Sequence, residues 1–170
     1  MKKIIGLIGL LFLLSGCAGN IKDGVSLLED GKYEKAVEAF KKDIDKKRNL
    51  DEAYRGLGIA YFELEEYESS VESLELARKH EAEETAVFCS ILGAGYLETE
   101  EYEKALDAYE RALACEDLTE ELEREIQFNL IAVYESMANW DAAKKQMDKY
   151  VEKYPDDTRV EKEAEFLETR

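Results

Sequence analysis

Residues 86–114 read AVFCSILGAGYLETEEYEKALDAYERALA, and this stretch holds a pattern that recurs along the chain. It predicts two helices joined by a short polar turn: an apolar segment that contains Gly93 and Tyr96, then an amphipathic segment that contains Tyr102 and Tyr109. A small residue such as Gly93 lets one helix cross another closely, and a neighbouring bulky side chain fills the space beside the crossing. The stretch therefore predicts a pair of packed helices.

The same pattern occurs four times. An aromatic residue followed three positions later by a small residue recurs with spacings of 34, 35 and 38 residues. A period of this length indicates one helix pair per copy, and each copy buries its apolar face by stacking on its neighbours. The aromatic residues are Tyr33, Tyr67, Tyr102 and Trp140; the small ones are Ala36, Ser70, Ala105 and Ala143; the bulky ones four positions later are Phe40, Leu74, Tyr109 and Met147. An upstream register holds Gly24, Gly58, Gly93 and Ile131, then Leu27, Tyr61, Tyr96 and Tyr134.

These registers resemble the tetratricopeptide repeat, and the resemblance covers nearly all of the chain after residue 20. It departs from the family at Ile131, where glycine is usual, and at Asp43, where a small residue is usual. The resemblance implies an all-α fold, a right-handed superhelical solenoid of antiparallel helix pairs. Residues 21–157 are expected to form four repeats and residues 158–170 a C-terminal capping helix. The repeat bounds are about 20–50, 51–84, 86–119 and 120–157.

Local signals mark two helix starts near the C-terminus. Repeat four is spaced more widely, and Asp117-Leu118-Thr119 offers an N-cap ahead of Glu120 and Glu121, so we expect about one added helical turn there. Asp157, which follows the single proline, is expected to cap the last helix.

The N-terminus predicts a lipoprotein signal peptide. Two lysines precede an apolar run over residues 4–14, which is too short to span a bilayer but typical of a signal sequence. The run leads into Leu14-Ser15-Gly16-Cys17, which resembles the bacterial lipobox. The resemblance implies cleavage of residues 1–16, attachment of a diacylglycerol with acyl chains such as palmitate to Cys17, and a short tether over residues 17–20. The alternative is an ordinary signal peptide with a chance cysteine.

These features predict a place in the bacterial cell envelope, on the extracytoplasmic face of a membrane. Ala18 does not resemble the aspartate that retains lipoproteins in an inner membrane, so we expect the outer membrane where the host has two. The net charge is −17, and removing residues 1–16 takes away two lysines and no acids, which makes it −19. Such an acidic chain repels nucleic acid, so we expect proteins or peptides as partners.

The sequence offers no catalytic or metal-binding constellation. His80 is the single histidine, which leaves no paired-histidine metal site. Gly93 and Gly95 fall within a helical register instead of a phosphate-binding loop. We therefore expect no enzymatic activity, no metal and no cofactor. An enzyme or a small-ligand receptor, the competing class, would need a cavity with converging polar groups.

Two cysteines remain once Cys17 is assigned to lipid. Cys89 and Cys115 are expected at the start and the end of one helix pair, where antiparallel packing would bring them together. A disulfide and two buried thiols therefore stay open as alternatives.

In the family that the chain resembles, the first helix of each pair lines a concave groove. The corresponding positions here form a mainly apolar set in which Arg55 and Asn129 are polar handles, so we expect an amphipathic helix or an extended apolar segment as the ligand. Carboxylate-gripping members use lysine and asparagine where this chain has Ile21 and Val25, so that mode is not expected. The alternative is a groove partly filled by the chain's own helices. The groove positions are Val25, Arg55, Ile59, Phe62, Ser90, Ala94, Leu97, Phe128, Asn129 and Ala132.

A basic cluster ends the second helix of repeat one: Lys41, Lys42, Lys46, Lys47 and Arg48. Only residues 18–20 separate Cys17 from Ile21, so the tether reaches at most ~14 Å. Antiparallel packing would place the cluster beside the anchored end, facing anionic headgroups. The alternative is a solvated helix C-terminus, where cations interact favourably with the helix dipole.

Together these features predict a membrane-tethered adaptor for protein–protein interaction. An assembly factor for envelope or secretion machinery is the alternative within the same class.

Overall fold

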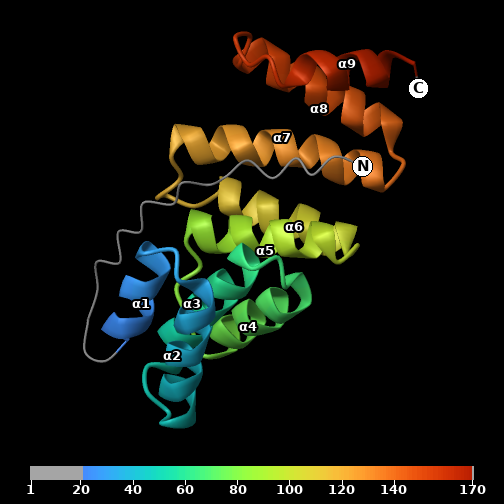
Figure 1. Cartoon of the computed structure of the whole chain (residues 1–170). Coiled ribbons are helices and arrows are strands. Elements are labelled where there is room, and N and C mark those ends of the chain that lie inside the picture. Colours follow the sequence, from blue (N-terminus) through green and yellow to red (C-terminus); the bar gives the residue numbers. More distant parts are fainter. Residues whose placement is uncertain (1–20, 170) are drawn as a thin grey trace. The chain divides into compact units, whose positions relative to one another are not determined.

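The structure is a computed structural model that describes residues 21–169, and the described part consists of α-helices and the turns between them (Figure 1). The signal peptide, the lipobox and Cys17 lie outside the described residues. Across residues 21–169 there are nine α-helices and no strand. They are α1 (Lys22–Glu29), α2 (Tyr33–Asp45), α3 (Leu50–Glu63), α4 (Tyr67–Lys79), α5 (Ala86–Glu98), α6 (Tyr102–Leu113), α7 (Glu120–Ser136), α8 (Trp140–Lys153) and α9 (Val160–Glu168).

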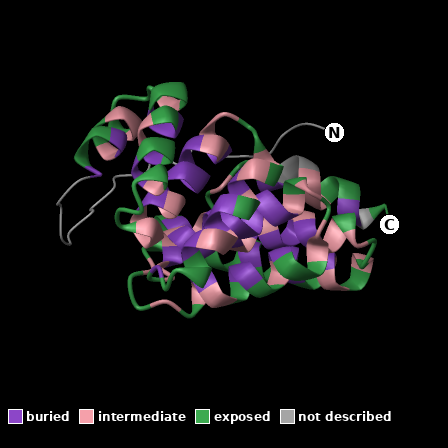
Figure 2. Ribbon diagram, turned by 90° about the horizontal axis from the view of Figure 1, so that it is seen from below, coloured by how far each residue is buried: buried purple, intermediate pink, exposed green. Residues whose placement is uncertain are grey.

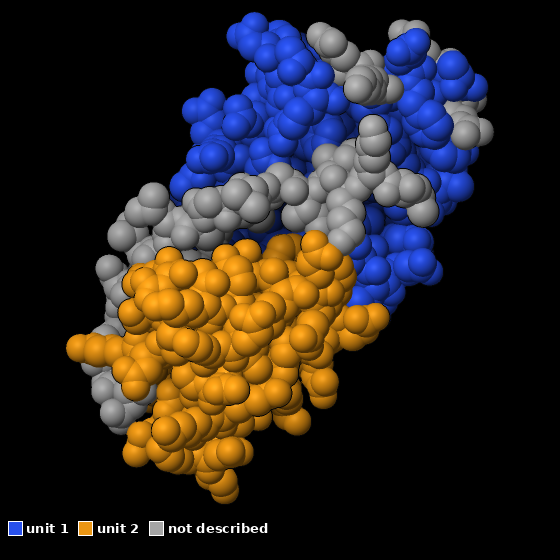
Figure 3. Space-filling view, in the orientation of Figure 1, with its two compact units in different colours: residues 1–4, 85–170 blue, residues 5–84 orange. Residues whose placement is uncertain are grey.

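The chain divides into two compact units between Glu84 and Thr85 (Figure 3). The described part of the N-terminal unit contains α1 to α4, and each of these helices packs on the next. The C-terminal unit contains α5 to α9, which also pack in sequence, and α5 contacts α7 as well. Each unit is therefore built from two helix pairs, and α9 adds a single helix to the second.

The four repeated aromatic residues occupy equivalent places. Tyr33, Tyr67, Tyr102 and Trp140 are the first residues of α2, α4, α6 and α8, the second helix of each pair. An aromatic ring at this point starts the returning helix next to the turn that joins the pair. The equivalence shows that the sequence period corresponds to one helix pair.

The turn inside each pair is the same in all four copies. The residue before the aromatic donates its backbone N–H to the carbonyl oxygen five residues earlier, at 2.8–2.9 Å. The residue before that has a left-handed backbone, which is the usual C-terminal end of an α-helix. Only the first copy has glycine there. The left-handed residues are Gly31, Glu65, Glu100 and Ala138.

Within the first three pairs, a glycine on the first helix faces a large side chain on the second. A Cβ atom built at Gly58 would lie 2.6 Å from Leu74 Cγ, and one at Gly93 would lie 2.9 Å from Tyr109 Cδ1. The missing side chains let the two helices approach closely. In the fourth pair Ile131 replaces glycine, and it shares a buried cluster with Met147. Methionine is unbranched and adapts to a less regular space.

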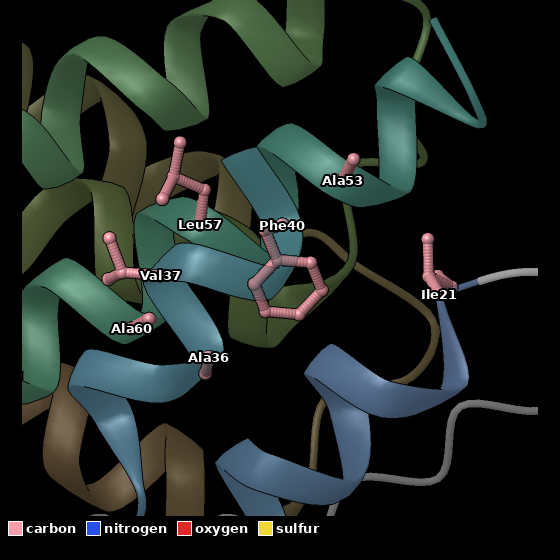
Figure 4. Close-up of a cluster of buried hydrophobic side chains, with 7 residues drawn as sticks. All are labelled: Ile21, Ala36, Val37, Phe40, Ala53, Leu57 and Ala60. Carbon is pink, nitrogen blue, oxygen red and sulfur yellow. The ribbon is translucent and has the colours of Figure 1, made fainter. Parts of the chain in front are cut away.

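Each unit has its own apolar core. Figure 4 shows the buried cluster of the N-terminal unit, in which Phe40 lies among side chains from α2 and α3 and the start of α1. The C-terminal unit buries Phe128, Ile131 and Tyr150 with Val160 and Leu167 of α9. Figure 2 shows buried residues along the sides on which helices pack and exposed residues on the opposite sides. This amphipathic pattern is the one the helix-period spacing predicts.

The predicted start of α7 is confirmed. Thr119 is its N-cap, and the Thr119 hydroxyl accepts a hydrogen bond from the backbone N–H of Leu122 at 3.2 Å. The helix has 17 residues and α5 has 13, so the wider repeat does contain about one added turn. Asp157 was expected to cap the last helix, and this was wrong: Arg159 is the N-cap of α9, and Asp157 accepts the Arg159 backbone N–H at 3.0 Å in the turn before it. Asp157 is instead held by the Arg159 guanidinium.

Candidate functional site

The candidate interaction surface in the C-terminal unit is carried by α5 and α7. Both are first helices of their pairs, and they contact each other. Of the predicted positions, Leu97 on α5 and Ala132 on α7 are half-exposed, whereas Ser90 and Ala94 are buried. Leu97 and Ala132 are therefore the two apolar members of the predicted set on these helices that are half-buried and not fully enclosed.

Two other predicted positions on α7, buried Phe128 and half-buried Asn129, interact with other residues of the chain. Phe128 is 3% exposed and packs edge-on against Tyr150, with ring centroids 5.5 Å apart, and the Arg159 guanidinium lies 5.0 Å from the centre of its ring. Burial raises the pKa of the Tyr109 hydroxyl, and the Asn129 side chain next to it acts in the opposite direction. At these two positions the side chain contacts a tyrosine from another helix of the same unit.

In the N-terminal unit the predicted positions are mostly enclosed. Ile59 and Phe62 are 4% and 7% exposed, and Val25 packs against the buried cluster of that unit. Arg55 forms an ion pair with Glu52 one helical turn earlier, and 12% of its side chain is exposed. Arg55 is therefore already engaged within its own helix.

The five residues of the basic cluster are all exposed, at the end of α2 and just after it. The Lys41 ammonium lies over the ring of Tyr61, 5.3 Å from its centre, and Arg48 lies 4.0 Å from the Asp43 carboxylate. The remaining three cations, Lys42, Lys46 and Lys47, have no ion pair with any other residue in the range 21–169. Ile21, the first described residue, belongs to the same buried cluster as Phe40. The first described residue thus packs close to the start of the basic cluster.

A polar network that the sequence did not reveal ties the α8–α9 turn to α7. Arg159 binds both carboxylate oxygens of Glu125 at 2.9 Å and the Asp157 carboxylate at 2.6 Å. The Tyr150 hydroxyl donates to the same Asp157 carboxylate at 2.6 Å. The Arg159 guanidinium therefore holds the pKa of Asp157 well below its usual range, although burial acts against this.

The same turn borders a pocket of about 480 Å³ in the C-terminal unit. Its walls come from the start of α7, the end of α8 and the turn that precedes α9. They are Arg124, Glu125, Lys153, Tyr154, Pro155, Asp156, Asp157, Thr158 and Arg159.

The two described cysteines are both thiols. Cys89 is buried, and Cys115 is half-buried with its sulfur 3.3 Å from the Arg111 carbonyl oxygen. Between residues 21 and 169, no three or more His, Cys, Asp or Glu side chains are grouped as metal ligands, and no helix in that range has the length and apolar character of a membrane span. His80 ends α4 and stacks on Tyr54 with ring centroids 5.4 Å apart.

Comparison with known proteins identifies the fold. Residues 125–157 match the family model of the tetratricopeptide repeat. No curated protein matches the chain in sequence.

Several solved structures are similar to the chain. The crystal structure of MamA is 24% identical, with a TM-score of 0.71 over 85% of this chain and 81% of its own. A MamA RS-1 double mutant is 20% identical, with a TM-score of 0.72 over 91% of this chain and 86% of its own. A putative kinesin light chain from Podosopora anserina, with nearly identical TPR-like repeats, is 16% identical, with a TM-score of 0.61 over 83% and 76% of the two chains.

At these identities the likeness concerns the fold. The expected fold class is confirmed: the chain is an all-α solenoid of helix pairs of the tetratricopeptide type, and residues 125–157 carry the sequence pattern of that repeat.

Proposed function

We propose that the chain is a membrane-tethered adaptor that binds a helical or extended apolar segment of another protein on the face shared by α5 and α7. One observation carries this proposal. Two contacting first helices, in a fold of the tetratricopeptide type, keep Leu97 and Ala132 only half-buried although most of α5 is buried. An apolar face on paired helices suits an amphipathic helix, which would bury its own apolar stripe there.

A charge placed on this face tests the proposal. Ala132→Glu would put a carboxylate against an incoming apolar segment, and burying that unpaired charge would be costly. Ala114→Glu is the matched control, because Ala114 is exposed just after α6 and the substitution changes net charge equally.

The assay is crosslinking in cells of the host followed by mass spectrometry of the proteins captured with each variant. We expect Ala132→Glu to lose specific partners that Ala114→Glu retains. The same captured proteins with both variants would remove this face from the function. Circular dichroism of both variants separates loss of binding from loss of fold.

The tether is the second part of the proposal. The lipobox sequence supports acylation of Cys17, which would hold the folded part at the extracytoplasmic face of the membrane, in the outer membrane where the host has two. Cys17→Ser removes the thiol that accepts the lipid. We expect this variant to leave the membrane fraction and to lack the mass of the diacylglycerol. A variant that still fractionates with membranes would contradict the tether.

The basic cluster is proposed to rest on anionic headgroups beside that tether. It stands out on a chain with net charge −17, and three of its cations have no ion pair within residues 21–169. Each exposed lysine near an anionic surface contributes about 1 kcal/mol of attraction. The packing of Ile21 near Phe40 supports a short path from the tether to the cluster.

Two triple variants test this surface with the same change in net charge. One reverses Lys42, Lys46 and Lys47 to glutamate, and the control reverses Lys144, Lys145 and Lys149 on α8. Docking is measured at low salt on vesicles that contain phosphatidylglycerol and on vesicles of phosphatidylcholine alone. We expect only the first variant to lose its preference for phosphatidylglycerol. Equal effects of both variants would show that net charge alone governs docking.

A further inference from the structure

The two described cysteines take no part in the functions proposed above, and both belong to the third helix pair. Cys89 is buried in the first turn of α5, and Cys115 is half-buried just after α6. The two helices pack on each other, and the Asp117 carboxylate accepts the Ala86 backbone N–H at 2.9 Å. This hydrogen bond ties the segment that carries Cys115 to the start of α5.

The second helix pair shows where the Cys89 side chain lies. Cys89 is four residues before Gly93, the glycine of α5 that faces Tyr109. Tyr54 is four residues before Gly58, the equivalent glycine of α3. Cys89 and Tyr54 therefore occupy the same register position on the first helices of their pairs.

Cys115 and His80 are equivalent in the same way. Each lies thirteen residues after the first residue of the second helix, α6 or α4. Each donates its backbone N–H to the carbonyl oxygen three residues earlier, at 3.2 Å from Cys115 and 3.0 Å from His80. The same hydrogen bond therefore holds the backbone at both positions.

In the second pair these two positions are in contact. The rings of Tyr54 and His80 are stacked, with centroids 5.4 Å apart and planes 9° apart. Because consecutive helix pairs repeat one packing geometry, the Cys89 and Cys115 side chains extend toward the same space beside their helices. The third pair thus has two thiols where the second pair has two stacked rings.

We propose that Cys89 and Cys115 are a redox pair, which a small disulfide such as oxidised glutathione converts to one disulfide between α5 and the segment after α6. In the structure both are thiols, and the Cys115 thiol donates to the Arg111 carbonyl oxygen at 3.3 Å. A disulfide needs Cβ atoms about 4 Å apart, so Cys115 must turn away from α6 toward Cys89. It lies beyond Leu113, the last residue of α6, and can turn without unwinding that helix.

The half-buried Cys115 reacts first, because Cys89 is enclosed. The Cys115 thiol loses its proton to water, and its sulfur attacks one sulfur of oxidised glutathione and releases one glutathione thiolate. The Cys89 thiol then loses its proton, and its sulfur attacks the Cys115 sulfur and releases the second glutathione. Two protein thiols are oxidised and one glutathione disulfide is reduced to two thiols.

The test equilibrates the full chain in detergent micelles with mixtures of reduced and oxidised glutathione, once folded and once in urea. Remaining thiols are blocked with N-ethylmaleimide, and tryptic peptides are analysed by mass spectrometry. Cys89 falls in peptide 80–104, Cys115 in 112–124 and Cys17 in 4–22, so each cysteine is followed separately. Glutathione supplies the oxidant, so the result does not depend on the membrane tether or on the face shared by α5 and α7.

We expect peptides 80–104 and 112–124 to become linked. The effective concentration of the two thiols should be at least about tenfold higher in the folded chain than in urea, because the fold holds them at facing positions. Cys89→Ser should accumulate glutathione on Cys115. The matched control moves one thiol by a single residue, Cys115→Ala with Ala114→Cys. Its effective concentration should fall at least about tenfold, because neighbouring residues of a helix point about 100° apart.

Three results would overturn the proposal. They are the absence of the linked peptides from the folded chain, an effective concentration no higher than in urea, and an equal effective concentration in the shifted control. The first two comparisons use the unsubstituted chain, so they remain decisive even if a variant fails to fold.

Discussion

Gly58→Ala tests the close approach of α3 and α4. The added methyl carbon would lie 2.6 Å from Leu74 Cγ and 3.2 Å from the Leu74 backbone nitrogen, and Leu74 is fully buried. Overpacking of this kind costs about 1–3 kcal/mol, whereas alanine gains up to about 1 kcal/mol over glycine in a helix interior. The net expectation is a loss of about 1–2 kcal/mol, or a fall in Tm of about 2–8 °C for a chain of this size.

The assay is urea and thermal unfolding followed by circular dichroism, with Leu74→Ala as the second arm of a double-mutant cycle. Leu74→Ala alone should cost about 2–5 kcal/mol, because it leaves a cavity. In that background Gly58→Ala should be neutral or stabilising, because the atoms it would meet are gone. The predicted role of Gly58 is refuted if Gly58→Ala lowers the free energy of unfolding equally in both backgrounds, or if it stabilises the parent chain. Either result would show that close approach of α3 and α4 does not require glycine at this position.

Three further predictions concern the C-terminal unit. Burial and the nearby Glu163 carboxyl raise the pKa of Glu135 to about 8, so the parent chain should lose stability as pH rises from about 4.5 to 8. Glu135→Gln should remove about 1–2 kcal/mol of that loss after allowance for solvent screening, measured as urea midpoints at pH 5 and pH 8; equal slopes in both proteins would contradict it. Tyr150→Phe removes the hydroxyl that donates to Asp157 and should cost about 1–2 kcal/mol in the same unfolding assay, whereas an unchanged midpoint would show that the bond is not stabilising. Thr119→Ala removes the N-cap of α7 and should cost about 1 kcal/mol, with Thr119→Ser as the control that keeps the hydroxyl.

The repeated architecture could be predicted because it depends on residue size at fixed spacing. Tyr102 at the start of a helix and Gly93 opposite Tyr109 are visible in sequence, since a crossing requires a small residue and a neighbour that fills the gap. The Thr119 cap could be predicted for a similar local reason. An N-cap side chain accepts a hydrogen bond from a backbone N–H two or three residues later, so the interaction can be recognised within a short stretch of sequence.

The turns and the polar network could not be predicted in the same way. Glu65 and Glu100 adopt a left-handed backbone conformation. The residue type predicts this conformation only when the residue is glycine, as at Gly31. The Arg159–Glu125 pair joins residues 34 positions apart, and nothing in the sequence singles out Glu125 among 40 acidic residues. Such pairings depend on how helices pack, which residue spacing alone does not determine.

The surface was harder to predict than the core. The repeat register gives the helix face on which a residue lies, but exposure depends on what the neighbouring segments cover. Phe128 and Asn129 were predicted to line the groove; Phe128 is buried against Tyr150, and Asn129 is half-buried beside Tyr109. Leu97, which lies near the end of the corresponding helix in the preceding pair, stays half-buried.

Photocrosslinking from α5 in intact cells tests the adaptor function most directly. A photoreactive amino acid is placed at Leu97 in one strain and at the exposed Ala114 in another, and adducts of the chain are resolved by mass. A partner seated on the proposed face should yield discrete adducts from position 97 that are absent from position 114 and that disappear with Ala132→Glu. The same adducts from both positions, or none from position 97, would contradict the claim that this face holds another protein.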